Sequence, residues 1–394
     1  MSSLSPSSQA TSPSLFQPAF VRVLGVQMAF GLSYSAFLLL PKFLRLEHGS
    51  SSTEIGWVAG AAVVAGAVFA PLVGTFLGRM PRRLLLGIGM SLAGFAALGF
   101  ALVEEVGWGM YALRALQGLA WASVTNVTAS MVAASVPRSE LARSIGYLGL
   151  SMLVTNALAP AVTEPLANAF GWQPVFAAAG VLALLSFALF PGLPRELEPA
   201  AADERDESNL SPRLLAVHYV SLLMGAGIGV MFTFTQPYAL EQGATRVGDF
   251  FFGYVAAAVF VRVVLGRLAD RVGPARVAAV ALGTYSLVVL ASSLLRPSWL
   301  IPLGLGIGVS HGFLYPALTA TGLAQLAPVS RSRFLGWFSG AFNLGFALTV
   351  LLLGPIADLY GFFPVYLIVG AWLASGVVPL VWTHRLPRPK PMVS

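Results

Sequence analysis

The stretch GRLADRVGPAR, residues 266–276, places four charged residues in a sequence that is otherwise very apolar. A related stretch, GTFLGRMPRR, begins at Gly74 and carries Gly78 at the position that corresponds to Asp270. Long apolar segments lie before and after both stretches. Because the same short basic pattern occurs once in each part of the chain, we expect two related halves with a charged loop in the same place.

The composition is that of a membrane protein. A soluble domain has roughly 45–50% apolar and about 25% charged residues, whereas this chain of 394 residues has 57% hydrophobic and 10% charged residues. The formal net charge is +7, but the basic residues mark the ends of apolar segments, so we expect no nucleic-acid partner. The absence of cysteine excludes disulfides and thiolate metal sites.

The apolar segments predict an all-α protein. A helix of about 20 apolar residues spans a bilayer because its backbone amides are hydrogen-bonded within the helix. We expect twelve transmembrane helices, at about residues 20–41, 53–78, 84–103, 108–135, 144–168, 172–191, 214–239, 248–268, 274–295, 299–326, 332–357 and 361–383.

Two polar stretches divide the chain. Residues 1–19 are rich in Ser and Pro and predict a disordered tail rather than a signal peptide. The charged stretch 194–213 predicts a linker between two six-helix bundles, at 20–193 and 214–384, and residues 385–394 predict a second tail.

Orientation follows from the basic residues, which gather on the cytoplasmic side of membrane proteins. Of the 23 Lys and Arg residues, 17 fall on the side of the N-terminus, and only Lys42, Arg45, Arg246 and Arg296 fall on the opposite side. We therefore expect both termini and the linker in the cytoplasm of a bacterial cell, with the helices in its plasma membrane.

The two halves also resemble each other in sequence. EPLANAFGWQPVF (164–176) and GPIADLYGFFPVY (354–366) align at an offset of 190, which also matches Gly118 with Gly308 and Gly146 with Gly336. An even number of helices keeps both copies in the same orientation, so we expect a parallel repeat about an axis along the membrane normal.

With these features the chain resembles the major facilitator superfamily. The loop signature of that family, Gly-x-x-x-Asp-Arg-x-Gly, is matched by Gly266, Asp270, Arg271 and Gly273, and in part by Gly74, Arg79, Arg82 and Arg83. RALQG at residues 114–118 resembles helix 4 of the drug:proton antiporters in the family. In place of their helix 5 pattern, Gly-Pro-x-x-Gly-Gly, this chain has LAPAVTEP at 158–165, which keeps only Pro160.

The resemblance implies a latch that closes the cytoplasmic side. Because Gly78 replaces the aspartate in the first half, we expect an asymmetric latch carried mainly by the second half. We also expect the glycine one turn before each loop to let two helices approach closely. The residues assigned to this cytoplasmic gate are Gly74, Arg79, Arg83, Arg262, Gly266, Asp270, Arg271 and Gly273.

Three titratable residues within the helices are candidates for proton coupling. Arg114 and Glu164 are each about six or seven residues from the outer end of a helix, a depth of about 10 Å. A charge in hydrocarbon needs a partner or water, so we expect these two residues to form an ion pair that a proton can break. His311 is near the middle of its helix, and a free imidazole titrates near neutral pH. The alternatives are a static ion pair and a hydrogen-bonded structural histidine.

A further set of polar and aromatic residues is predicted to line a largely apolar substrate cavity. Its members lie on helix faces that we expect to face the cavity, and Trp121 and Thr125 are in phase with Arg114. They are Gln27, Tyr34, Trp121, Thr125, Phe232, Gln236, His311, Tyr315 and Asn343. No Walker loop and no hydrolase motif occurs, which argues against an ATP-driven pump and against an enzyme.

The sequence therefore predicts a secondary transporter. The preferred interpretation is proton-coupled efflux of a small amphipathic molecule (a drug, secondary metabolite, sugar or siderophore) by a monomer in the lipid bilayer, without a cofactor. The first alternative is an uptake permease for a sugar or organic anion. A membrane-embedded enzyme or a receptor is a remote alternative from another class.

Overall fold

The computed structural model describes residues 17–77, 79–136, 140–193, 211–266, 271–326 and 330–385, and within those ranges every regular element is a helix. The first half contains α1 (Pro18–Ser35), η1 (Ala36–Leu39), α2 (Leu40–Glu47), α3 (Ser52–Leu77), α4 (Arg82–Phe100), α5 (Trp108–Ser135), α6 (Leu141–Phe170), α7 (Trp172–Leu185) and η2 (Ser186–Gly192).

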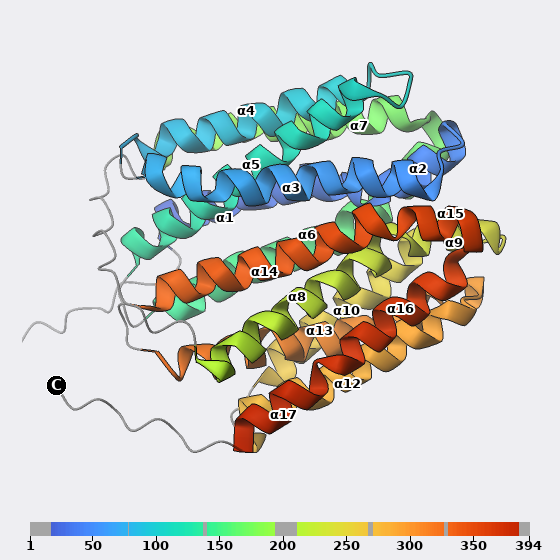
Figure 1. Ribbon diagram of the computed structural model, residues 1–394. Coiled ribbons are helices and arrows are strands. Elements are labelled where there is room, and N and C mark those ends of the chain that lie inside the picture. Colours follow the sequence, from blue (N-terminus) through green and yellow to red (C-terminus); the bar gives the residue numbers. More distant parts are fainter. Residues whose placement is uncertain are drawn as a thin grey trace, which may run out of the picture.

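The second half contains α8 (Pro212–Thr233), α9 (Thr235–Glu241), α10 (Gly248–Val264), α12 (Pro274–Ala291), η4 (Ser292–Leu294), η5 (Pro297–Trp299), α13 (Leu300–Leu323), α14 (Arg331–Leu352), α15 (Gly354–Tyr360), α16 (Phe362–Ser375) and α17 (Val377–Arg385). The helices run along a common direction, and those of each half pack mainly on one another (Figure 1).

Ten candidate membrane spans are present in the described part of the chain. Several contain a break at proline, which lacks an amide hydrogen and disturbs the preceding turn. The first span runs as α1, η1 and α2 from Pro18 to Glu47, and Pro41 lies at the start of α2. The same kind of break separates α14 from α15 at Pro355. The predicted segment 20–41 is therefore too short, because the chain continues as a helix after the break.

Matched glycines confirm that the two halves share local structure. Gly171 and Gly361, which align in the sequence, have φ angles of 84° and 75° and precede α7 and α16 in the same way. This backbone conformation strongly favours glycine because a Cβ would clash. Gly118 and Gly308 also match. Each touches the backbone of a neighbouring helix, α3 for Gly118 and α10 for Gly308, so that neither has room for a side chain.

The start of α3 shows why this helix begins where it does. The Ser51 hydroxyl accepts a hydrogen bond from the Glu54 amide at 3.1 Å, and the Glu54 carboxylate accepts one from the Ser51 amide at 2.9 Å. This reciprocal capping box satisfies backbone donors that have no partner within the helix.

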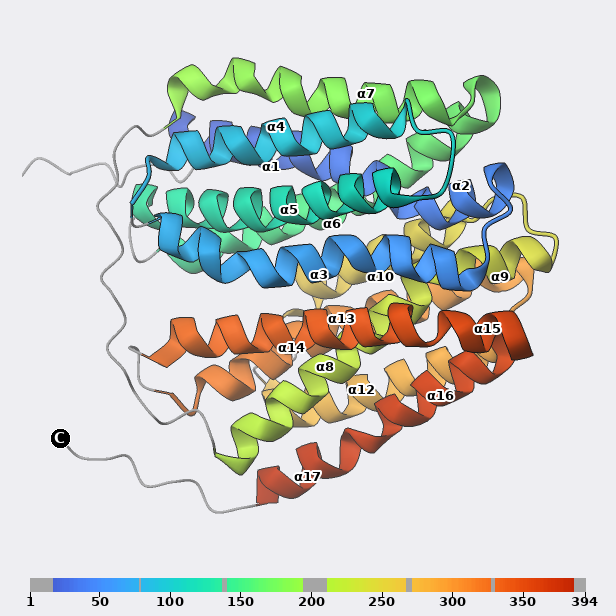
Figure 2. The ribbon, with the colours of Figure 1, turned by 45° about the horizontal axis from the view of Figure 1, so that its top comes forward.

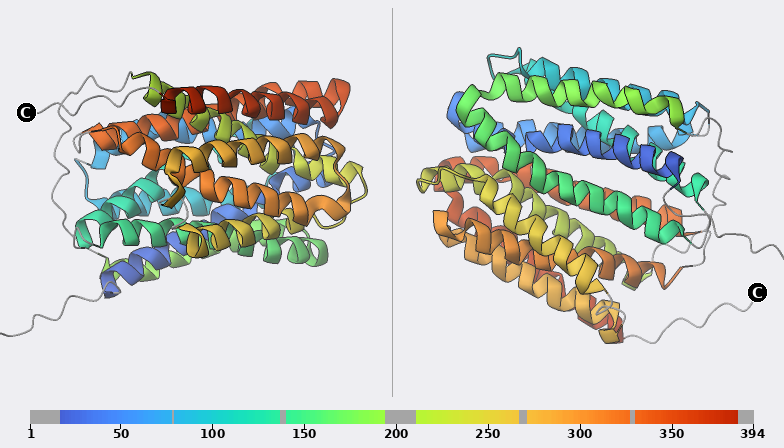
Figure 3. Two further views of the ribbon diagram at one scale, coloured as in Figure 1. Left: turned by 90° about the horizontal axis from the view of Figure 1, so that it is seen from below. Right: turned by 180° about the vertical axis from the view of Figure 1, so that it is seen from behind.

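The two halves contact each other along α3 with α14 and along α6 with α10 (Figures 2 and 3). Among the described residues, the hydrogen bonds between the halves lie at the end of the molecule formed by α2, α9 and α15, which we call the joined end. The opposite end, where α1 and α8 begin and α17 ends, we call the basic end (Figure 1).

Candidate functional site

A buried ion pair of the first half lies at its boundary with the second half, at the joined end. The Lys42 ammonium on α2 lies 2.7 Å from Oε1 of Glu164 on α6, and the two residues are 2% and 4% exposed. The Lys42 ammonium also donates to the Thr245 carbonyl of the second half at 3.1 Å. Removing two charges from water is costly, so a pair this buried requires further hydrogen bonds to both members.

Glu164 obtains those further bonds from the start of α10. The amides of Val247 and Gly248 donate to the two carboxylate oxygens, each at 2.8 Å. Val247 is the N-cap residue of α10, and its side chain has no acceptor for the free amides. A carboxylate from the first half therefore caps a helix of the second half, where the positive end of the helix dipole favours a negative charge.

Two neighbouring residues shape this contact. A Cβ on Gly248 would stand 2.6 Å from Oε2 of Glu164, so the close approach of the carboxylate requires glycine. Gln236, which is 1% exposed, donates to the Leu38 carbonyl at 2.7 Å and accepts from the Lys42 amide at 3.3 Å. Gln236 was predicted to line the substrate cavity, but its amide group instead joins the two halves.

A second carboxylate, which belongs to the second half, caps a helix of the first half. Asp358 on α15 accepts hydrogen bonds from the Ser52 amide at 2.6 Å and the Thr53 amide at 2.9 Å, both at the start of α3. The Thr53 hydroxyl donates to the same carboxylate at 2.5 Å. Each half therefore caps a helix of the other. We call the contacts of Glu164 and Asp358 the inner clasp and the outer clasp, because Glu164 is buried and Asp358 is exposed.

The predicted ion pair between Arg114 and Glu164 is wrong. Arg114 is 7% exposed and donates to the Gln117 side chain at 2.5 Å and to the Val58 carbonyl at 3.3 Å. It also donates to the Tyr34 hydroxyl. The two residues were predicted at a similar depth, but depth does not determine which neighbouring helix a side chain faces. Glu164 lies on the face of α6 that meets α10, whereas Arg114 points to α1 and α3.

Lys42 and Asp358 were not among the predicted site residues. Lys42 appeared to be an ordinary surface cation beyond the end of the first helix, because the predicted helix ended at residue 41. A signal was present in the sequence: the stretch LPKFL continues as an amphipathic helix after Pro41, which carries Lys42 back against the protein.

Four of the predicted lining residues lie together in the first half. The rings of Tyr34 and Trp121 are 4.7 Å apart, and both side chains are half-buried. Gln27 is 3% exposed and accepts a hydrogen bond from the Thr128 hydroxyl at 2.7 Å, which ties α1 to α5. Thr125 donates to the Trp121 carbonyl at 2.7 Å within α5. Gln27 and Thr125 therefore serve helix packing in this arrangement.

In the second half, the predicted lining residues His311 and Tyr315 lie on α13, and Tyr254 of α10 is their neighbour. The Tyr254 hydroxyl is 2.9 Å from Nδ1 of His311, and the Tyr315 ring lies 6.1 Å from the His311 ring. His311 is 9% exposed, whereas Tyr315 is 37% exposed. The glycines on the same helix face pack against α10, so only part of this predicted stripe is accessible.

The two remaining predicted lining residues, Phe232 and Asn343, lie in different surroundings. The Phe232 ring packs edge-on against Phe250, Phe251 and Tyr254, which places it in an aromatic cluster between α8 and α10. Asn343 on α14 is half-buried.

Arg262, near the end of α10, extends toward the first half. Its Nη1 lies 3.7 Å from the position that a Cβ on Gly149 of α6 would occupy. Its Nε is buried and has no hydrogen-bond partner among the described residues.

The loop signature is only partly described. Asp270 and Gly78 lie outside the described residues, and Arg79 and Arg271 are exposed. A Cβ on Gly74 or Gly266 would meet no atom within 4 Å, so the expected close helix approach at these glycines is wrong for this arrangement. Gly273 has a φ of 100° and begins α12, so its role is to form the turn.

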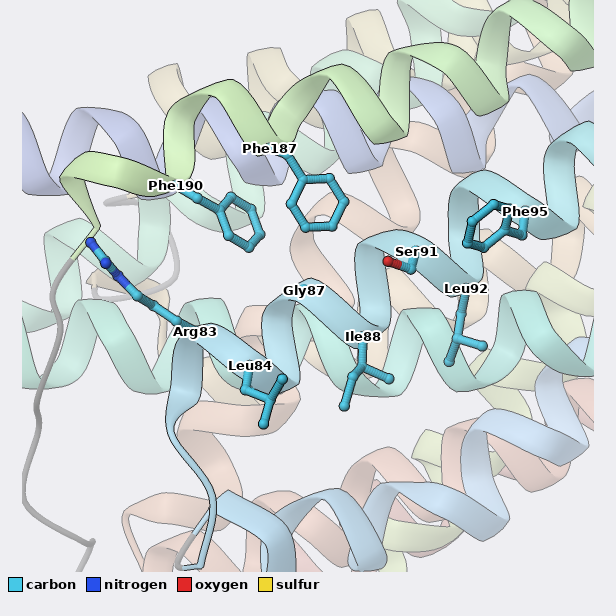
Figure 4. Close-up of a pocket in the computed structure, with 9 residues that line it drawn as sticks. All are labelled: Arg83, Leu84, Gly87, Ile88, Ser91, Leu92, Phe95, Phe187 and Phe190. Atoms are coloured by element: carbon cyan, nitrogen blue, oxygen red, sulfur yellow. The ribbon is translucent and has the colours of Figure 1, made fainter.

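Among the described residues, the hydrogen bonds of Arg83 stay within the first half. Its guanidinium donates to the carbonyls of Pro191 and Leu193, which fastens α4 to the end of η2. Beyond Arg83, an open apolar groove of about 440 Å³ runs between α4 and η2 on the outer face, past Gly87, Ser91 and Phe187 (Figure 4). Within the described part of the chain, no group of three or more His, Asp or Glu side chains forms a metal site.

The chain matches a family model with the description Major Facilitator Superfamily, over residues 23–323 and 244–394. It is 25% identical to the staphylopine export protein of Staphylococcus aureus over 92% of this chain and 95% of that protein. It is 26% identical to the multidrug resistance protein MdtG of Escherichia coli, over 92% of this chain and 94% of that protein.

Solved structures share the fold. The nucleoside transporter NupG superimposes with a TM-score of 0.77 at 11% identity, over 93% of this chain and 100% of that chain. A bacterial homologue of the human lysosomal transporter Spinster, in an inward-facing and occupied conformation, gives a TM-score of 0.77 at 13% identity, over 95% of this chain and 99% of that chain.

Proposed function

The chain belongs to the Major Facilitator Superfamily, and on that premise we propose that it exports a small amphipathic molecule in exchange for protons. It is a multi-pass protein of the cell inner membrane and a transporter rather than an enzyme. The direction of transport is supported by the relatives named for staphylopine export and multidrug resistance. No observation specifically favours the uptake alternative.

The proposal includes twelve transmembrane helices with both termini in the cytoplasm. The two helices that would bring the ten candidate spans to twelve are α5 and α10. α10 has 17 residues, about 26 Å of helix, and α5 has 28 residues but carries Arg114. The excess of Arg at the basic end supports a cytoplasmic location for that end. The joined end then faces the periplasm, and the arrangement described above is closed to the outside.

Coupling is proposed to occur at the inner clasp, with Lys42 rather than Arg114 as the cationic partner of Glu164. The observation that carries this step is the buried carboxylate, which accepts hydrogen bonds from Lys42 and from two α10 amides. A proton on Glu164 would remove the negative charge that all three donors require. The halves would then separate at the periplasmic end, and loss of the proton would allow them to close again.

The test is Glu164→Gln in proteoliposomes under an imposed pH difference. We expect the variant to exchange substrate without a gradient but to lose proton-driven accumulation, because glutamine cannot take up or release the proton. The matched control is Glu241→Gln, which removes the carboxylate of the exposed pair with Arg45 at the same end. Proton-driven accumulation by Glu164→Gln at the control rate would show that Glu164 is not the coupling carboxylate.

A further inference from the structure

The acidic and basic side chains are distributed unequally along the described helices. Apart from Glu140 at the basic end, the described carboxylates lie at or near the joined end: Glu47, Glu54, Glu104, Glu105, Glu164, Glu241, Asp249 and Asp358. Arg114 on α5 lies about as far from that end as Glu164, whereas Arg262, in the last turn of α10, lies farther along than any of these carboxylates. The part of α10 toward the basic end therefore carries a positive charge without a described carboxylate to balance it.

Neither cation forms a described ion pair. Arg114 is bonded to neutral acceptors, namely an amide oxygen, a carbonyl and a phenol. The buried Nε of Arg262 has no hydrogen-bond partner at all among the described residues. A charge within a membrane protein is expensive, and such residues are retained where they meet a partner, a substrate or water. A ligand that supplies anionic oxygens would satisfy Arg262 where the described residues do not.

Arg262 lies opposite the part of α13 that carries Tyr315, because its chain neighbour Val261 meets Gly312, which is one turn before Tyr315. Tyr315 is partly accessible, its ring packs at 5.5 Å against Phe338, and His311 lies next to it. The side chain of Arg262 reaches α6, so a ligand bound there would contact both halves of the protein. An aromatic wall next to a guanidinium fits a molecule with an apolar body and a negatively charged group.

We propose that the transported molecule is an amphipathic organic anion and that Arg262 contacts its anionic group, with Tyr315 packing against its apolar part. This rests on the proposed export function and narrows its substrate class. Lipophilic cations, which the positive charge of Arg262 and Arg114 would repel, are excluded as preferred substrates. The same contact gives a reason for the position of Arg262 between the halves, since no carboxylate among the described residues balances its charge.

The experiment measures binding to the purified full-length protein by fluorescence anisotropy. The probes are two dyes with the same xanthene ring system, the anion carboxyfluorescein and the cation tetramethylrhodamine ethyl ester. We expect the anion to bind more tightly to the unmodified protein. Arg262→Gln should weaken anion binding roughly tenfold or more, as expected for loss of a charged hydrogen bond, and Arg262→Lys should restore part of it. Arg331→Gln, which removes an exposed cation at the start of α14, is the control.

Three outcomes would overturn the proposal. They are tighter binding of the cation, no binding of the anion, and anion binding that Arg262→Gln leaves unchanged. A purely structural role for Arg262 as part of a cytoplasmic latch predicts the last of these, together with a loss of transport. None of these outcomes depends on a pH gradient, so they are distinct from failure of the coupling experiment on Glu164.

Discussion

The amide of Gly248 on α10 donates a hydrogen bond of 2.8 Å to Oε2 of Glu164 on α6, across the boundary between the two halves. A side chain at position 248 would push the carboxylate away, because its Cβ would stand 2.6 Å from that oxygen. We therefore expect Gly248→Ala to loosen the joined end without changing any charge.

This loosening is measurable in a chain that has no cysteine of its own. A cysteine at Leu39, which is fully buried on η1, should react several-fold faster with a membrane-impermeant maleimide when Gly248→Ala is present. Gly283→Ala serves as the control, since a Cβ there would meet no atom within 4 Å. Equal labelling rates in the two variants would mean that the clasp tolerates the extra methyl group.

Lys42→Gln should be among the most destabilising changes at the joined end. It leaves Glu164 buried without its cation, a loss of about 3–5 kcal/mol in comparable buried pairs. Arg45→Gln breaks the pair with Glu241, whose side chains are 29% and 39% exposed, and should change stability by about 1 kcal/mol or less. Thermal unfolding of the purified proteins in detergent measures both effects.

The double variant Lys42→Gln with Glu164→Gln tests the same relationship in another way. With both charges absent, no carboxylate remains buried without a partner, so the double variant should be more stable than Lys42→Gln alone. If the two effects simply add, the side chains are not coupled as their 2.7 Å contact implies.

Access from the basic end should distinguish Tyr315 from His311. Tyr315 is 37% exposed, whereas His311 is 9% exposed and bonded to Tyr254. A cysteine in place of Tyr315 is expected to react with a water-soluble thiol reagent at least tenfold faster than one in place of His311. Inert thiols at both positions would show that this face of α13 is sealed by neighbouring helices.

Asp270 remains the main candidate for a latch at the basic end. Because Gly78 stands at the corresponding position of the first half, no second aspartate can replace its function. Asp270→Asn is expected to reduce efflux strongly at equal membrane abundance, and Asp249→Asn, a carboxylate at the other end of α10, is the control. Normal efflux by Asp270→Asn would remove the latch from the proposed mechanism.

The helices and the repeat could be predicted from the sequence because local patterns determine them. Apolar length sets a span, and the matched glycines Gly171 and Gly361 mark equivalent turns in both halves. The partner of Glu164 could not be predicted in this way. Helical periodicity gives the depth of a residue and the face that it shares with others, but not which neighbouring helix meets that face.

The contacts between the halves were the least predictable part of the site. They join residues that are far apart in the sequence, such as Gln236 with Leu38 and Asp358 with Thr53. Gln236, Asp358 and Thr53 are ordinary polar residues near helix ends, and nothing local separates them from similar residues that face water. Only the arrangement of both halves gives them partners.

The unequal burial of the two clasps sets an order for their release. Water already reaches Asp358, so its hydrogen bonds to α3 can be exchanged one at a time for bonds to solvent. The bonds of Glu164 must break before water can enter, which places the larger kinetic barrier there. Separation of the halves therefore starts at the Asp358 contacts of α15 and ends at the bonds between Glu164 and the α10 amides.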